Sequence, residues 1–140
     1  MAGCEEKELL AWESRSLIGC LYELQRNTDA VCALIVQDDA AVLAKITTNA
    51  KFEVDTLGVF SSMMFATARM VARELEAEGE VLGGITIGTE YYLLVMGITP
   101  KVALVTLCRK ALAKGVLEYE ARVLMPRLVE CLGHLTPQIP

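Results

Sequence analysis

The sequence has few of the residues that enzymes and metal sites use most. It contains a single histidine, His134, and its five cysteines are scattered without a Cys-x-x-Cys pair. A zinc site needs clustered ligands, and a Ser–His or Cys–His catalytic pair needs a histidine beside its nucleophile. Gly83, Gly84 and Gly88 form neither a Walker pattern nor a dinucleotide-binding fingerprint. We therefore expect no catalytic residues, no metal and no cofactor.

Basic clusters and long apolar segments are also scarce. The net charge of −5 and the scattered lysines and arginines argue against a nucleic-acid surface. The uncharged stretch from Thr56 to Ala68 is shorter than the ~20 residues that span a bilayer. The first residues, MAGCEEKE, lack the basic-then-apolar order of a signal peptide, and an odd number of cysteines is typical of free thiols. These features predict a cytoplasmic protein that binds no nucleic acid and does not insert into membranes.

Aliphatic residues are what the chain has in excess. Hydrophobic residues make up 54% of the sequence and aromatic residues only 6%. A chain of 140 residues suits one domain with one core. We expect a single domain over 1–140, with its folded core at about 8–132 and a loose tail over 133–140, after Gly133 ends the last helix.

The hydrophobic periodicity predicts an order of helix, two strands, helix, three strands, helix. The first helix is expected over 5–26, with Leu10, Leu17, Leu21 and Leu24 on one stripe. The second helix is expected from Asp55 to Glu78, capped by Asp55 or Thr56 and ended by Gly79. The expected strands cover 31–36, 42–47, 81–87, 91–96 and 102–107, and a final helix carries Leu117, Ala121, Leu124, Leu128 and Cys131 on one stripe. This order favours one antiparallel sheet covered by helices.

The second of these helices has more apolar surface than one core contact needs. One set of apolar residues at helical spacing is Leu57, Phe60, Met64, Val71 and Leu75, and a second set on a neighbouring side is Val59, Met63, Ala66 and Met70. A helix on the surface of a small domain needs one apolar stripe of roughly 100°. The second stripe is therefore expected to face another polypeptide, and Gly58, Ser62 and Ala66 are small enough for a close helix approach.

Individual residues on the predicted helices have two interpretations each. Met63, Met64 and Met70 either form an adaptable partner surface or fill the core. Arg69 and Arg73 either interact with a partner or lie on a solvated face. As partner contacts they would pair with carboxylates of a GTPase, or in principle reach its nucleotide as an arginine finger. Trp12 is either an exposed anchor or is covered by a neighbouring element.

These patterns together resemble the Roadblock family, which is named for a dynein light chain and includes bacterial and archaeal regulators of Ras-like GTPases. The likeness spans about residues 8 to 132 and rests on the segments VCALIVQDDAAVLAK, LGVFSSMMFATARMVARELE, GGITIGTEYYLLVMGI and VALVTLCRKALAKGVLEYEAR. The first hairpin turn differs, because Ala40 stands where relatives commonly have glycine. The resemblance implies an α+β fold: a five-stranded antiparallel sheet with the central helix on one face and the first and last helices on the other.

The resemblance also implies a non-enzymatic homodimer that binds a small Ras-like GTPase through paired central helices and either stimulates GTP hydrolysis or acts as a scaffold. Edge strands at 81–87 would join, and an unprotected edge of this kind is a pairing template. The expected partner and dimer residues are Val59, Met63, Ala66, Arg69, Met70, Arg73, Val81, Gly83 and Ile85. The alternative is a small-molecule sensor, which would need a cavity of ~300 Å³ or more between sheet and helix.

Overall fold

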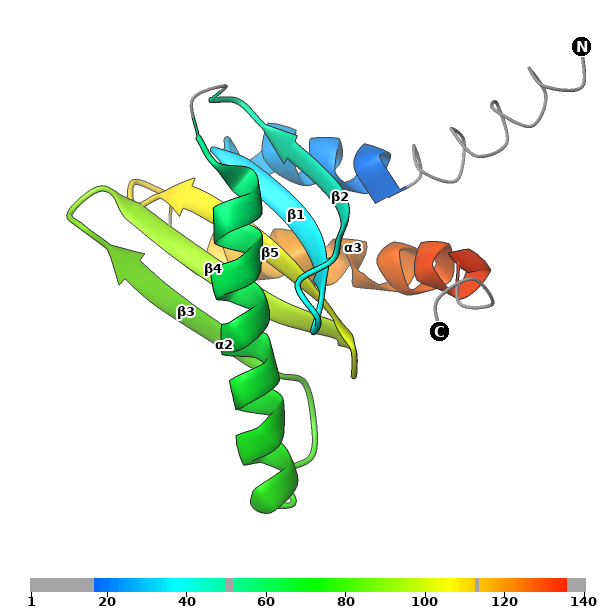
Figure 1. Cartoon of the computed structure of the whole chain (residues 1–140). Helices are drawn as coiled ribbons and strands as arrows, with labels where there is room; N and C mark the ends of the chain where they lie inside the picture. The colour runs from blue at the N-terminus through cyan, green and yellow to red at the C-terminus, as the bar shows by residue number, and fades with distance from the viewer. Residues whose placement is uncertain (1–16, 50–51, 113, 136–140) are drawn as a thin grey trace, which may run out of the picture.

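The computed structural model describes residues 17–49, 52–112 and 114–135, and for 134–135 only the backbone. The expected positions Leu10, Trp12 and the tail over 136–140 lie outside the described residues. Within them, a helix over 17–28 precedes the strands β1 and β2, the helix α2, the strands β3, β4 and β5, and the helix α3 (Figure 1). The element bounds are Cys32–Gln37 for β1, Val42–Thr47 for β2, Val54–Glu74 for α2, Leu82–Ile87 for β3, Tyr91–Thr99 for β4, Val102–Arg109 for β5 and Lys114–Leu135 for α3.

The five strands form one sheet in the order β2-β1-β5-β4-β3, and every neighbouring pair is antiparallel. Short turns join β1 to β2, β3 to β4 and β4 to β5, as expected for hairpins. The remaining contact, between β1 and β5, closes the sheet in the middle, with Leu34 opposite Val105. The expected fold is confirmed, and β2 and β3 are left at the two edges.

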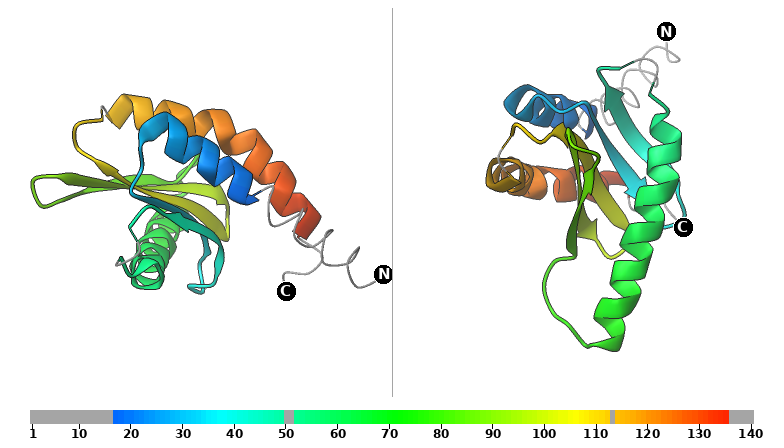
Figure 2. Two further views of the ribbon diagram at one scale, coloured as in Figure 1. Left: turned by 90° about the horizontal axis from the view of Figure 1, so that it is seen from above. Right: turned by 90° about the vertical axis from the view of Figure 1, so that its left-hand side faces the viewer.

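Helices cover both faces of this sheet. The helix over 17–28 and α3 lie side by side on one face, and α2 lies on the other (Figure 2). Each face has its own apolar core, with Leu21, Ile35 and Leu128 on the two-helix side and Leu34, Phe65 and Val105 on the α2 side. Strands β1 and β5 are apolar along almost their whole length because both of their faces are covered.

Helix α2 contacts the sheet only along its first half. Its buried residues are Val54, Leu57, Gly58, Ser61, Ser62 and Phe65. No residue of α2 after Phe65 is buried, although the helix continues for about 13 Å at 1.5 Å per residue. The second half of α2 therefore projects beyond the sheet, as Figure 1 shows.

Three expected helix ends are wrong. Helix α2 begins after Glu53, which makes no side-chain cap, so that Asp55 lies inside the first turn, where it pairs with Lys45 of β2. It ends at Glu74, before Gly79, because Glu76 adopts the left-handed conformation with φ of 52°. The Ala77 N–H then donates to the Ala72 carbonyl, which completes a Schellman motif. Helix α3 continues past Gly133 to Leu135.

The first hairpin turn keeps the backbone shape that glycine favours. Ala40 has φ of 76°, in the left-handed region, and its N–H donates to the Gln37 carbonyl at 3.1 Å. The Asp39 carboxylate accepts the N–H of Ala41 at 3.0 Å, which is common turn chemistry for aspartate. Ala40 thus holds a left-handed conformation that costs more free energy for alanine than for glycine.

Candidate functional site

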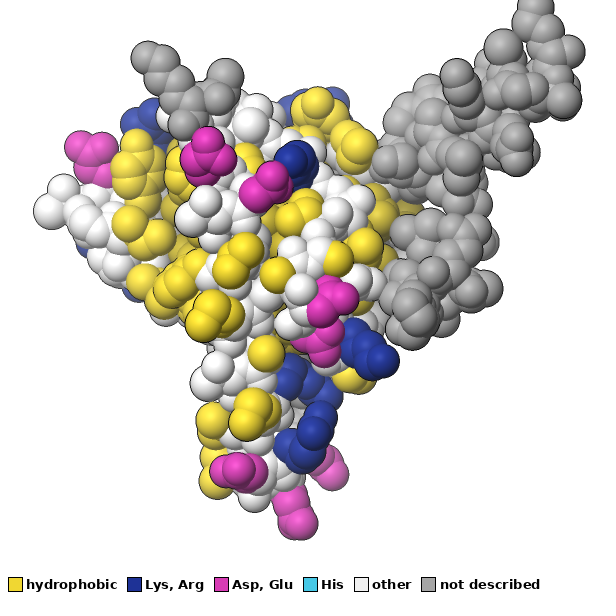
Figure 3. Space-filling model, viewed as in Figure 1, with side chains coloured by type: hydrophobic (Ala, Val, Ile, Leu, Met, Phe, Trp, Pro, Cys, Tyr) yellow, Lys and Arg dark blue, Asp and Glu magenta, His cyan; other side chains and the backbone are white. Residues whose placement is uncertain are grey.

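Six large apolar side chains along α2 remain open to solvent, five within the helix and one, Leu75, at its C-cap. Their exposed fractions run from 47% to 72%, and they are Val59, Phe60, Met63, Met70, Val71 and Leu75. We call this set the α2 apolar surface. Figure 3 shows hydrophobic side chains gathered along this helix and over the neighbouring part of the sheet. Single exposed apolar residues are common on any protein, whereas these six follow one another along a single helix and its C-cap.

The contacts of α2 with β2 fix which way its sides point. Asp55 forms an ion pair with Lys45 of β2 at 3.0 Å, and a Cβ on Gly58 would lie 3.1 Å from Val42 of the same strand. With 100° per residue, Phe60 and Val71 fall on the opposite flank, toward β4 and β3. By the same geometry Val59, Met63 and Met70 point away from the sheet. The α2 apolar surface thus has a flank toward β3 and an outer face.

Strand β3 continues this surface at the edge of the sheet. Gly83 lies opposite Val95 and Ile85 opposite Leu93, and both partners belong to the core beneath α2. Since paired residues share a face, Gly83 and Ile85 lie on the α2 side of the sheet. Ile85 is half-buried, and an added Cβ on Gly83 would meet nothing within 4 Å. Among the described strands, β3 is paired only with β4, so its outer edge is open.

The opposite face of β3 is closed by a tyrosine. A Cβ on Gly84 would lie 1.8 Å from the hydroxyl oxygen of Tyr92, so this side chain occupies the space that a larger residue would need. The Lys114 ammonium lies 4.6 Å from the centre of the Tyr92 ring, in cation–π contact. The two adjacent glycines therefore differ in their surroundings. Gly83 has open space where a Cβ would stand, whereas Tyr92 occupies that space at Gly84.

The structure separates the predicted site residues by exposure. Three of them, Val59, Met63 and Met70, are exposed on α2, and so is Arg73. Ala66, Arg69, Val81, Gly83 and Ile85 are only partly exposed. Val81 precedes β3, yet its carbonyl accepts the Gly97 N–H at 2.8 Å and so extends the pairing with β4.

The sequence reasoning assigned the wrong residues to the buried side of α2. Of the set at Leu57, Phe60, Met64, Val71 and Leu75, only Leu57 is buried and Met64 is half-buried. Gly58 and Ser62 face the sheet and not another helix, and the Ser62 hydroxyl donates to the Gly58 carbonyl at 2.7 Å. The small residues Gly58, Ser61 and Ser62 could have indicated the buried side, because a helix can pack closely on a sheet where its side chains are small.

A pocket lies beneath the projecting half of α2. It encloses about 270 Å³ and is lined by Phe65, Arg69, Gly79, Glu80, Val81, Gly97, Ile98, Thr99 and Pro100. Glu80 forms an ion pair with Arg122 of α3. The volume is below the ~300 Å³ at which small-molecule sites begin, so this pocket gives the sensor alternative little support.

The described residues hold no group of three or more histidine, cysteine, aspartate or glutamate side chains that could bind a metal ion. In the same part of the chain, the helices are each too short or too polar to cross a bilayer.

Comparison with known proteins identifies relatives by structure and not by sequence. No protein-family model and no curated protein matches the sequence. The structure of MglB from Myxococcus xanthus is similar with a TM-score of 0.78 and 12% identity, covering 86% of this chain and 90% of that chain. The gliding protein MglB from Thermus thermophilus is similar with a TM-score of 0.72 and 20% identity, covering 85% of this chain and 90% of that chain. A Roadblock/LC7 domain from Streptomyces avermitilis is similar with a TM-score of 0.71 and 15% identity, covering 81% of this chain and 94% of that chain.

Proposed function

Because this chain has a Roadblock-type fold, we propose that it is a non-enzymatic adaptor or regulator that forms a homodimer and binds a small Ras-like GTPase. The observation that carries the proposal is the α2 apolar surface beside the open edge of β3. The link to a GTPase rests on the resemblance to the Roadblock family. Both parts of the proposal can be tested separately, because they use different sides of α2.

The open edge of β3 supports the proposed homodimer. Two copies of β3 placed side by side would satisfy each other's free backbone groups and continue the sheet across both subunits. The flank of α2 that faces β3 would then meet the same flank of the partner, covering Phe60, Val71 and Leu75. A stable interface needs ~1,200–2,000 Å² in total, which a joined strand and a helix pair can supply. MglB itself occurs in a tetrameric arrangement, so self-assembly suits this fold.

The GTPase would contact the outer face of the paired α2 helices. Val59, Met63 and Met70 offer an apolar centre, and methionine adapts its shape to a partner. Arg73, exposed near the end of α2, offers a positive charge at the rim. The mechanism is mass action: the protein favours the nucleotide state of the GTPase that it binds more tightly, by the difference between the two binding free energies.

Three valines provide a matched test. Val71 lies on the flank toward β3, Val59 on the outer face and Val123 on α3, with exposed fractions of 50%, 50% and 52%. All three are helical, so replacement by aspartate changes charge and helix propensity alike. The three variants therefore differ only in which surface of the protein receives the aspartate.

We expect Val71→Asp to weaken the dimer, measured by light scattering across a dilution series. We expect Val59→Asp to preserve the dimer and to weaken GTPase binding at least tenfold, since a buried unpaired charge costs more than about 1.4 kcal/mol. Val123→Asp is expected to change neither. Binding is measured by immobilising the protein, identifying retained GTPases in the GDP and the nonhydrolysable GTP state, and repeating the measurement with the purified GTPase.

A wild-type protein that stays monomeric at tens of micromolar would overturn the dimer. Equal retention of the purified GTPase by the Val59 and Val123 variants would overturn the binding surface.

A further inference from the structure

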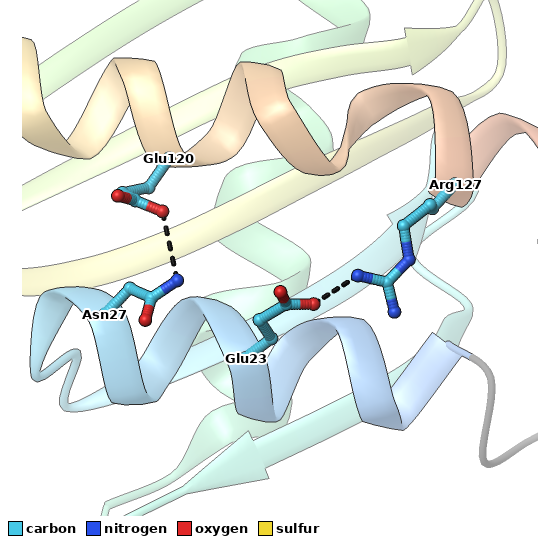
Figure 4. A network of polar contacts seen from close by, with 4 residues as sticks. All are labelled: Glu23, Asn27, Glu120 and Arg127. Carbon is cyan, nitrogen blue, oxygen red and sulfur yellow. Dashed lines mark hydrogen bonds and ion pairs between the residues drawn. The ribbon is translucent and has the colours of Figure 1, made fainter.

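The two helices on one face of the sheet are joined by side-chain contacts. The helix over 17–28 and α3 run antiparallel, side by side (Figure 2). The Asn27 amide donates to the Glu120 carboxylate at 3.1 Å, and Glu23 forms an ion pair with Arg127 (Figure 4). These contacts show which sides of the two helices face each other.

The facing sides of the two helices also carry two cysteines. Cys20 lies one turn before Glu23, and Cys131 lies one turn after Arg127, so both continue the facing sides. Cys20 belongs to the apolar core on this face of the sheet, and Cys131 packs against that core. The fold thereby brings together two sulfur atoms that are far apart in the sequence.

The two thiols differ in their access to solvent. Cys20 is buried with 1% of its surface exposed, whereas Cys131 is half-buried. The other described cysteines do not form such a pair, because Cys32 lies in the core beneath α2 and Cys108 lies in the core on the two-helix face. Burial raises the pKa of the Cys20 thiol, and the charge of Arg127 counteracts part of this rise. A small oxidant thus reaches Cys131 first and finds a second thiol beside it.

We propose that Cys20 and Cys131 form an oxidation-sensitive pair, which hydrogen peroxide converts into a disulfide between the first helix and α3. The Cys131 thiolate attacks one oxygen of the peroxide, the O–O bond breaks, and the leaving hydroxide takes up a proton to become water. The sulfenic acid formed on Cys131 is then attacked by the Cys20 sulfur. The S–S bond forms, the S–O bond breaks, and the proton of Cys20 leaves in a second water. Two thiols and one peroxide therefore give one disulfide and two waters.

The disulfide would clamp the helix layer without using α2 or β3. It closes a long loop of chain between the two cysteines, which restricts the unfolded state. We expect the melting temperature of the oxidised protein to rise by several degrees over that of the reduced protein. The dimer mass is expected to stay the same, so this inference and the proposed function can fail independently.

The cysteine arrangement makes the test direct, since trypsin places each cysteine in a different peptide. The full chain is treated with hydrogen peroxide at one equivalent, blocked with iodoacetamide and digested without reduction. The expected product is a disulfide joining peptides 16–26 and 128–140, which carry Cys20 and Cys131. Peptides 1–7, 27–45 and 102–109, which carry Cys4, Cys32 and Cys108, are expected to stay alkylated.

Two variants control the result. Cys131→Ser changes a half-buried residue, so the protein is expected to keep its circular dichroism spectrum and to lose the cross-link. Cys108→Ser is the matched control and is expected to retain the cross-link. Conversion of Cys131 to a sulfinic acid without a link, a link between two chains, or a link through another cysteine would each overturn the proposal.

Discussion

Replacing Gly84 by alanine is expected to destabilise the protein through Tyr92. An ideal Cβ at Gly84 would lie 1.8 Å from the Tyr92 hydroxyl oxygen and 2.4 Å from the ring carbon that carries it. Both distances are far below van der Waals contact, so the tyrosine must move. Its ring also carries the cation–π contact with Lys114, and a displaced ring weakens that contact.

The magnitude follows from two opposing effects. Forcing an extra methyl group into a filled space costs about 1–3 kcal/mol. Replacing glycine by alanine lowers the entropy of the unfolded chain, which stabilises the fold by about 0.4–1 kcal/mol. We therefore expect Gly84→Ala to lower the free energy of unfolding by about 1.3 kcal/mol, the difference between the midpoints of these two ranges.

Gly83→Ala is the matched control in the same strand. Its added Cβ would meet nothing within 4 Å, so only the entropy effect remains. We expect this variant to be neutral or to gain up to about 1 kcal/mol. A second control introduces Gly84→Ala into a Tyr92→Leu background, where the penalty is expected to disappear as a coupling between the two sites.

Urea unfolding followed by circular dichroism provides the measurement, at two protein concentrations so that any dimer contribution is visible. The midpoint of Gly84→Ala is expected to fall with an unchanged m value. Equal midpoints for the two alanine variants, or a penalty that persists without Tyr92, would refute the steric reasoning.

Three further predictions concern stability. Ser61 has a buried hydroxyl without a hydrogen-bond partner among the described residues, so Ser61→Ala is expected to raise the free energy of unfolding by about 1 kcal/mol. Ser62→Ala removes a 2.7 Å hydrogen bond and is expected to lower the free energy of unfolding by about 1 kcal/mol. Urea midpoints that moved in the same direction would contradict this. Ala40→Gly is expected to add about 1 kcal/mol by relieving the positive φ, and an unchanged melting temperature would count against that strain. Burial raises the pKa of Cys32 from 9.0 to about 12, so the unfolded chain releases this proton first and stability falls as pH rises from 9 toward 12, by about 1.4 kcal/mol per pH unit. Cys32→Ala is expected to show a shallower fall in urea midpoints between pH 8 and 11, and an identical slope would refute the assignment.

Most of the fold could be predicted from the sequence, because its elements are marked by local patterns. The strand β2 was placed at its observed bounds, and β1 and β3 were placed within one residue of theirs. Apolar runs broken by short polar turns specify hairpins without reference to the rest of the chain. Helix ends were predicted less well: α2 ends before Gly79, because Glu76 adopts the left-handed conformation that ends the helix three residues earlier.

The candidate site was predicted only in part. The sequence showed that α2 has too much apolar surface for one contact, and the exposure of Val59, Met63 and Met70 agrees with that excess. It did not show which side meets the sheet. Hydrophobic periodicity predicts that the most apolar residues face the core. In the structure α2 instead turns small residues such as Gly58 and Ser61 toward the sheet.

By itself, the sequence determined the type and order of the elements and the surplus of apolar surface on the central helix, because these depend on neighbouring residues and their spacing. Only the tertiary structure decided which flank of α2 stays open and which edge of the sheet lies beside it. It also decided that Cys20 and Cys131 lie on facing sides of two helices, in and against one core. Such features depend on how distant segments pack, and no local pattern encodes the distance between them.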